Sequence, residues 1–243
     1  MTWIFLSPHL DDAVLSCGGL IAGLNQAVQI WTIFAGDPPA GELAPFAREL
    51  HERWQTGPAA AAARRAEDAA ACTRLGALYR HFSYPDCIYR RLPDGQPVIG
   101  GREDLFRPPT EPGLVDELAA QIARQAPAGA RVVCPLSYGG HVDHRIVRAA
   151  AEQTGCGLWY YPDYPYAVRP EAGGADAPLP ALPVNSEPVT FHLREEHLAA
   201  WEAAAAAYVS QLSTFWANEN AMRAALREYA RLGGGSTLYR VAF

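Results

Sequence analysis

Short apolar runs, polar turns and longer segments with apolar residues at helical spacing follow one another along the chain. Apolar runs rich in β-branched and aromatic residues predict buried strands. The longer segments predict helices, and one of them is rich in alanine, the strongest helix former. The predicted strands cover residues 3–6, 28–35, 78–84, 131–135, 158–161, 189–193 and 236–243. The predicted helices cover residues 13–24, 58–75, 113–125, 145–153, 195–211 and 218–232.

Strands that alternate with helices predict an α/β fold of the Rossmann-like type, a mostly parallel sheet with helices on both faces. In such a fold the active site lies at the carboxyl ends of the strands. We find no internal repeat and no linker, so we expect residues 1–243 to form one domain. Residues 40–57 have no clear period and indicate a loop or short helix with a solvated charged face, or, less favoured, a lid.

The first polar turn follows the strand at 3–6 and carries His9, Asp11 and Asp12. It lies between a strand and a helix, where open α/β sheets bind their ligands. Two interpretations compete. In the first, Asp11 or Asp12 caps the helix and His9 is a surface residue. In the second, His9 and Asp12 are metal ligands and Asp11 is a free base.

A second turn of the same kind, His141-Val142-Asp143-His144, follows the strand at 131–135 and opens a helix. Two such turns on neighbouring strands can face each other across one crevice, which would bring His9, Asp12 and His144 together. Two imidazoles and one carboxylate leave a coordination position open, as in hydrolytic zinc sites. Zinc in that set would lower the pKa of a bound water to about 7.

The other polar residues of the two turns have predicted roles around that metal. Asp11 is placed to take a proton from the water. His141 is placed to donate to a developing oxyanion or to protonate a leaving amine. Asp143 would orient one of the imidazoles.

Composition narrows the choice of partners. The 243-residue chain carries a net charge of −6 and has no basic run, so we expect no nucleic-acid partner. No apolar stretch approaches the roughly 20 residues of a membrane span, and no signal peptide is evident, so we expect a cytoplasmic protein. No coiled coil or interface stripe indicates an oligomeric state. The five cysteines have no CxxC spacing, which favours reduced thiols over a disulfide framework or a cysteine zinc site. Any metal would therefore be held by nitrogen and oxygen. The cysteines are Cys17, Cys72, Cys87, Cys134 and Cys156.

These residues together resemble a known family. The segment Ser-Pro-His-Leu-Asp-Asp-Ala at 7–13, with Gly18-Gly19 and the His-Val-Asp-His motif, is similar to the PIG-L/LmbE-like zinc-dependent N-acetylglucosaminyl deacetylases. The first motif of that family reads Ala-His-Pro-Asp-Asp-Glu, so Leu10 and Ala13 stand in place of its proline and glutamate. Weaker matches are Arg64-x-x-Glu67 before Leu75-Gly76, Tyr84-Pro85-Asp86, Gly36-Asp37 and residues 204–212.

The resemblance implies one zinc ion per chain, bound by His9, Asp12 and His144, with Asp11 as the base and His141 as the group that stabilises the oxyanion. It also implies that Arg64, Asp86 and Asp37 contact the substrate. Iron(II) could occupy the same ligands, because affinity order alone does not settle metal identity. Tyr138 lies near the place of a family tyrosine, but two glycines separate it from His141 where the family has one.

The sequence therefore predicts a zinc hydrolase that removes an N-acetyl or other small N-acyl group from an amino sugar or its conjugate. A second hypothesis keeps the metal chemistry but has a non-sugar or thiol-conjugate amide as substrate. A third is a catalytically silent α/β binding module, which would purify without stoichiometric zinc. The aromatic loop at 160–166 would suit a larger aglycone in either of the first two cases.

Overall fold

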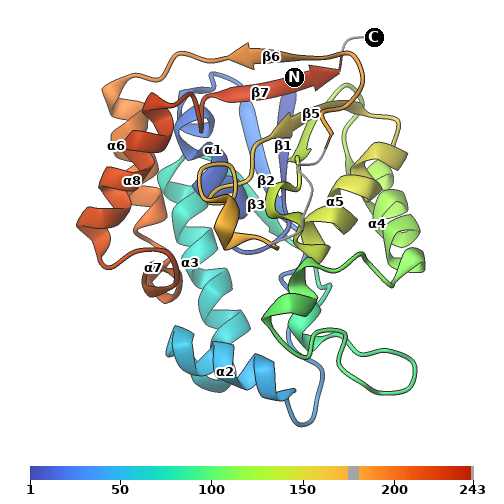
Figure 1. The fold of residues 1–243 in the computed structure, drawn as a ribbon. Coiled ribbons are helices and arrows are strands. Elements are labelled where there is room, and N and C mark those ends of the chain that lie inside the picture. Colours follow the sequence, from blue (N-terminus) through green and yellow to red (C-terminus); the bar gives the residue numbers. More distant parts are fainter. Residues whose placement is uncertain (175–180, 242–243) are drawn as a thin grey trace.

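The computed structural model describes residues 1–174 and 181–241, and a seven-stranded sheet forms its centre (Figure 1). The strand order is β3-β2-β1-β4-β5-β7-β6. The first five strands in this order run parallel, and β7 pairs antiparallel with both β5 and β6. The strands are β1 (Thr2–Ser7), β2 (Ala27–Thr32), β3 (Leu78–His81), β4 (Arg131–Pro135), β5 (Gly157–Tyr161), β6 (Ser186–Thr190) and β7 (Thr237–Val241).

Helices cover both faces of the sheet, so the predicted fold class is confirmed. One face is covered by α1, α3, α6 and α8, and the other by α4 and α5 (Figure 1). The helices are α1 (Asp12–Gly23), α2 (Pro45–Trp54), α3 (Ala60–Arg74), α4 (Pro112–Gln125), α5 (Val142–Gln153), α6 (Glu195–Ala205), α7 (Val209–Phe215) and α8 (Glu219–Arg231). No helix among the described residues is long and apolar enough to cross a membrane.

Burial of strand β1 on both faces of the sheet explains why its sequence is a continuous apolar run. Successive side chains of a strand point to opposite faces, and this strand is covered on both. Trp3 and Phe5 enter the core beneath α1 and α6, whereas Ile4 and Leu6 enter the core beneath α4 and α5. The run ends at the polar residues of the first motif, which are thereby held at the carboxyl edge of the sheet.

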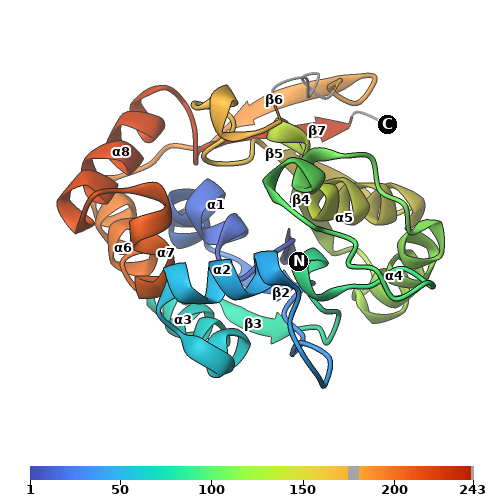
Figure 2. The same cartoon turned by 60° about the horizontal axis from the view of Figure 1, so that its bottom comes forward.

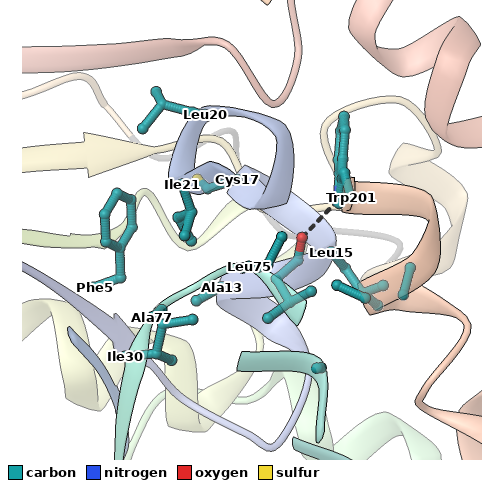
Figure 3. Packing of buried hydrophobic residues seen from close by; sticks show 14 of the residues in the cluster. Phe5, Ala13, Leu15, Cys17, Leu20, Ile21, Ile30, Leu75, Ala77 and Trp201 are labelled. Atoms are coloured by element: carbon teal, nitrogen blue, oxygen red, sulfur yellow. Dashed lines mark hydrogen bonds between the residues drawn. The ribbon is translucent and has the colours of Figure 1, made fainter. Parts of the chain in front are cut away.

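Close packing of α1 against α6 fixes the helix that follows the first motif. The Trp201 indole nitrogen of α6 donates a hydrogen bond of 2.7 Å to the Val14 carbonyl oxygen of α1 (Figure 3). A methyl group on Gly18 would lie only 2.1 Å from Cδ1 of Trp201. Gly18 is therefore required by this contact between helices.

We expect Gly18→Ala to lower the free energy of unfolding by about 1–3 kcal/mol, because the added methyl forces Trp201 out of its packed position. Urea denaturation followed by circular dichroism measures this difference. Gly113→Ala is the matched control, since a methyl group there meets no atom within 4 Å and alanine favours the helix. Equal stability of Gly18→Ala and the wild type would contradict this account.

Two elements differ from the sequence prediction, and a third settles the choice that was left open between a loop and a short helix. The segment 40–57 contains a full helix, α2, whose Phe46, Leu50 and Trp54 form an apolar stripe, and its His51 is buried. The predicted helix at 195–211 is interrupted between α6 and α7. Backbone and hydroxyl groups of Ser210 donate hydrogen bonds of 2.9 and 2.6 Å to Glu67, which holds the start of α7 away from the line of α6. The strand predicted at 189–193 lies at Ser186–Thr190 instead, where it pairs with β7.

Candidate metal centre and active site

A pocket of about 620 Å³ opens at the carboxyl ends of the strands, where the predicted active site lies. The two motifs meet there because β1 and β4 are adjacent parallel strands, so that the turns which follow them share one edge. His9, Asp11, Asp12, His141 and His144 all line this pocket. Helix α2, the 3₁₀ turn η3 (Arg102–Phe106), residues 165–172 and α7 contribute most of the remaining wall, together with Arg64, Asp86 and Ile88. Figure 2 shows α2 and α7 next to each other on the same side of the molecule.

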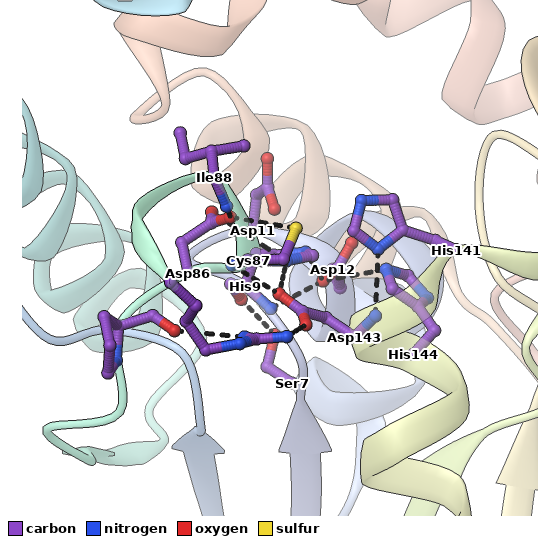
Figure 4. Close-up of polar contacts among 12 residues, drawn as sticks. Ser7, His9, Asp11, Asp12, Asp86, Cys87, Ile88, His141, Asp143 and His144 are labelled. Atoms are coloured by element: carbon purple, nitrogen blue, oxygen red, sulfur yellow. Dashed lines mark hydrogen bonds and ion pairs between the residues drawn. The ribbon is translucent and has the colours of Figure 1, made fainter. Parts of the chain in front are cut away.

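Two imidazoles face one carboxylate oxygen at the base of the pocket. His9 Nδ1 lies 3.1 Å, and His144 Nε2 lies 3.4 Å, from Oδ2 of Asp12 (Figure 4). Burial raises the pKa of Asp12, but the neighbouring His144 and His9 outweigh it and hold that pKa well below its usual value. The predicted ligands His9, Asp12 and His144 are therefore brought together, with one nitrogen of each ring directed to the same point.

The second nitrogen of His9 faces another buried carboxylate. His9 Nε2 lies 3.0 Å from Oδ2 of Asp143, which is fully buried. Arg90 donates a hydrogen bond of 2.7 Å to the other oxygen of Asp143. Burial raises the pKa of Asp143, but Arg90 and His9 overcome it and keep the pKa far below its usual value. Asp143 thus contacts the His9 ring as an anion, in the position that a group orienting this imidazole would occupy.

Asp163, which the sequence analysis did not single out, has the same relation to His144. Its Oδ1 lies 2.5 Å from His144 Nδ1, and its other oxygen accepts a hydrogen bond of 3.1 Å from the Tyr138 backbone. Burial lowers the pKa of His144, yet the Asp12 and Asp163 carboxylates raise it to about 9. Asp163 follows β5 shortly after the end of the strand, and this position is the one weak signal of a site residue that its sequence carries.

We expect Asp163→Asn to weaken zinc binding by about tenfold or more, because a neutral amide no longer fixes the His144 ring with a charged acceptor. Competition with a chromogenic chelator measures the zinc affinity of the purified variant. Asp94→Asn is the control, because Asp94 is an exposed turn residue that accepts a hydrogen bond from Gln96. Unchanged zinc affinity in Asp163→Asn would rule out this orienting role.

Asp11 lies beside the predicted ligand Asp12, but in the described part of the chain its carboxylate forms no hydrogen bond or ion pair with the His9 or His144 imidazole. Burial and the neighbouring Asp12 charge raise the pKa of Asp11 to about 7, although Arg64 opposes the shift. The Arg64 guanidinium lies 3.7 Å from Oδ2 of Asp11 and stacks on Trp54 at 4.6 Å. A carboxyl group with such a pKa is suited to accept and return a proton near neutral pH.

His141 is the N-cap residue of α5, and a backbone group in the first turn of that helix fixes its side chain. Its Nδ1 accepts a hydrogen bond of 3.2 Å from the Asp143 backbone N–H. Burial and the adjacent His9 and His144 hold the pKa of His141 well below its usual value. A neutral imidazole whose Nδ1 accepts a hydrogen bond carries its proton on Nε2, so that this nitrogen is a donor.

The predicted substrate contacts divide into two groups. Arg64 and Asp86 both line the pocket, and the buried Nε of Arg64 has no hydrogen-bond partner among the described residues. Asp37 lies outside the pocket wall, with an exposed side chain that forms an ion pair of 2.8 Å with Arg65. Tyr138 is also absent from the pocket wall and packs into the core beneath α4 and α5.

The donor types at this site fit a divalent metal of the zinc class. Among the described residues, three groups bring possible ligand atoms within 4.8 Å of one another: His9–His141–His144, Cys87–His141–Asp143 and His9–Asp86–Asp143. Asp12 is in none of these groups, so the exact ligand set stays a prediction. The arrangement in which each metal-facing imidazole is held from behind by a carboxylate is nevertheless typical of zinc sites.

Comparisons with known proteins agree with this geometry. The family model PIG-L, described as GlcNAc-PI de-N-acetylase, matches residues 4–154. A 2′-N-acetylparomamine deacetylase of Streptomyces fradiae is 32% identical over 180 residues, which cover 70% of this chain and 59% of that protein. A 2′-N-acetylparomamine deacetylase of Niallia circulans is 30% identical over 191 residues, covering 68% of this chain and 67% of that protein. The match thus spans less than two thirds of the Streptomyces relative.

Solved structures resemble the chain over nearly its whole length. The zinc-inhibited form of teicoplanin deacetylase Orf2 has a TM-score of 0.81 and 29% identity, covering 99% of this chain and 97% of that one. The A40926 pseudoaglycone deacetylase Dbv21 has a TM-score of 0.74 and 30% identity, covering 99% and 98%. These relatives are named as deacetylases, which are hydrolases of amide C–N bonds. The family predicted from the two motifs is confirmed: the chain belongs to the PIG-L family.

Proposed function

We propose that this chain is a zinc-dependent N-deacetylase that removes an acetyl or other small acyl group from an amino sugar or an amino-sugar conjugate. The observation that carries the proposal is the convergence of His9, His144 and Asp12 at the base of the pocket, with the buried Asp11 beside them. The names of the relatives support the reaction class. The proposal treats residues 1–243 as one deacetylase-like domain.

His9, Asp12 and His144 are the residues that would hold the metal, and Asp143 and Asp163 would keep the two rings in position. Zinc, when bound, supplies a Lewis acid that polarises the amide carbonyl and makes water a stronger nucleophile at neutral pH. One zinc ion per chain is proposed, and iron(II) fits the same nitrogen and oxygen donors.

Asp11 is the proposed general base. Its carboxylate takes the proton from the attacking water and passes it toward the amide nitrogen that leaves. The pKa of Asp11 is raised in the metal-free site, and the positive charge of a cation held by its neighbours would lower it. The carboxyl group would then be ionised at neutral pH, as a base must be.

His141 is the proposed electrophilic partner. Because its Nδ1 accepts the Asp143 N–H, its Nε2–H is free to donate a hydrogen bond into the pocket. Such a donor stabilises the negative charge that develops on the carbonyl oxygen during attack. A donor of this kind is expected to raise the rate by roughly 10²–10³.

Arg64 and Asp86 are the proposed contacts to hydroxyl groups of the sugar, since both line the pocket beside the predicted base and ligands. A pocket of about 620 Å³ is large enough for more than an acetylated monosaccharide, and apolar and aromatic side chains form part of its wall. These side chains are Phe46, Leu50, Trp54, Leu105, Phe106 and Phe215. We therefore propose a conjugate with an apolar portion as the natural substrate.

The test is an assay of acetate release by zinc-loaded protein on three types of amide. They are the methyl glycoside of N-acetylglucosamine, an N-acetylglucosamine glycoside with an aromatic aglycone, and an N-acetylcysteine conjugate without a sugar. We expect both sugars to be deacetylated, with a higher kcat/KM for the aromatic glycoside. Hydrolysis of the cysteine conjugate alone would favour the non-sugar amidase. No hydrolysis and no bound zinc would favour the silent binding module.

A further inference from the structure

The pocket wall contains four arginines, and they differ in their partners. Arg53 forms an ion pair of 3.1 Å with Glu49, and Arg64 lies 3.7 Å from Asp11. Arg102 and Arg169 also line the pocket, but neither forms an ion pair with a carboxylate among the described residues, 1–174 and 181–241. Two guanidinium groups on this wall thus carry charge that the described side chains do not balance.

Among the described residues, the hydrogen bonds of both arginines go to backbone oxygens. Arg102, from η3, donates a hydrogen bond of 2.9 Å to the Ala172 carbonyl, and its guanidinium lies 5.8 Å from the centre of the Phe106 ring. Arg169 donates a hydrogen bond of 3.1 Å to the Phe215 carbonyl of α7. Each contact uses one N–H group, and a guanidinium has five. The remaining donors are available to a ligand in the pocket.

The net charge of the whole pocket lining also favours an anionic ligand. Four carboxylates (Asp11, Asp12, Glu49 and Asp86) and four arginines line the pocket. A bound divalent cation would therefore leave the lining with a net positive charge. In a partly enclosed pocket such a charge favours an anionic substrate over a neutral one and disfavours a polycation.

We propose that Arg102 and Arg169 form an anion subsite in the pocket wall, which selects amino-sugar conjugates that carry a carboxylate or a phosphate. This inference rests on the proposed function and names the substrate class of that same site. Guanidinium groups bind both anions through paired N–H donors, so the shared chemistry is a planar or tetrahedral oxyanion. The contribution of the two arginines is to substrate binding and not to the chemical step.

The test compares kcat/KM of the zinc-loaded protein for three probes: the methyl glycoside of N-acetylglucosamine, its carboxyl-bearing analogue N-acetylmuramic acid, and N-acetylglucosamine 1-phosphate. We expect at least one anionic probe to exceed the neutral glycoside. In Arg102→Gln and Arg169→Gln, the ratio of kcat/KM for that anion to kcat/KM for the neutral glycoside should fall about 5- to 20-fold, because a charge-assisted hydrogen bond is lost. The preferred anion distinguishes a carboxylate from a phosphate ligand.

Arg53→Gln is the matched control, since it removes the same charge from the same pocket at a residue already paired with Glu49. Its ratio should stay within about twofold of the wild type, and Arg169→Lys should retain more of the preference than Arg169→Gln. Deacetylation of the neutral glycoside in each variant reports that the site is intact. Equal ratios for all probes, or an equal fall in Arg53→Gln, would overturn the subsite while leaving the deacetylase proposal standing. No deacetylation of any sugar probe would overturn the deacetylase proposal itself.

Discussion

Asp11→Asn is expected to keep its zinc and lose turnover, with kcat lower by about 10²–10⁴. Asparagine has nearly the same shape as aspartate but cannot accept a proton. Among the described residues, the Asp11 carboxylate makes no hydrogen bond to the His9 or His144 imidazole, in contrast to Asp12, so its replacement leaves the proposed ligands in place. Elemental analysis of the purified variant measures the zinc, and acetate release from an N-acetylated amino sugar measures kcat.

Asp116→Asn is the control for this variant, because Asp116 is exposed on α4 and far from the two motifs in the sequence. It should match the wild type in both measurements. Near-full activity of Asp11→Asn would mean that another group is the base. Loss of zinc from Asp11→Asn would mean that Asp11 is itself a ligand.

His144→Ala is expected to lose zinc and acetate release together, because it removes one of the two imidazoles that face Asp12. It also leaves the fully buried Asp163 without its imidazole partner. An unpaired buried polar group costs about 1–3 kcal/mol, so the free energy of unfolding should fall by a similar amount. Elemental analysis, acetate release and urea denaturation test the three effects on one preparation.

The comparison for His144→Ala is His192→Ala, which replaces an exposed histidine outside the pocket. That variant should keep metal, activity and stability. If His144→Ala retained a full complement of tightly bound zinc, the proposed ligand set would be wrong. One of the two groups without His144, either Cys87–His141–Asp143 or His9–Asp86–Asp143, would then have to hold the metal.

Much of this site could be predicted because its residues lie in two short motifs directly after strands. The alternation of strands and helices indicates a parallel sheet, and a parallel sheet places the ends of adjacent strands at one edge. His9 and His144, which are 135 positions apart in the numbering, could be expected to meet for that reason alone. The continuous apolar run of β1 similarly indicates a strand buried on both faces.

Other features of the site and the fold depend on contacts between residues far apart in the sequence, which no local pattern predicts. Asp163 follows a strand but lies in an aromatic, proline-rich loop without a motif, and only its approach to His144 reveals its role. The break between α6 and α7 comes from Glu67 on a distant helix, whereas the local sequence favours one continuous helix. Asp37 was expected at the substrate on the strength of a weak motif, and the structure instead pairs it with Arg65 outside the pocket wall.

The sequence did not decide between a loop and a helix for the segment that forms α2. Among such undecided segments, α2 contributes most to the pocket wall and therefore to the proposed substrate choice. Its charged residues Arg48, Glu49, Glu52 and Arg53 are exposed, as expected of a solvated face. Two of them, Glu49 and Arg53, also line the pocket together with apolar side chains of the same helix. The position of this helix against the site becomes recognisable only in the folded structure. Loops and short helices around a fixed site commonly set specificity in this way.

The most direct test of the central claim is a zinc titration of chelator-treated protein, with acetate release from the methyl glycoside of N-acetylglucosamine measured at each addition. The account predicts no activity without metal, a linear rise, and a plateau at about one zinc ion per chain, as one open three-ligand site requires. Full activity in metal-free protein, or no acetate release at any zinc concentration, would contradict it.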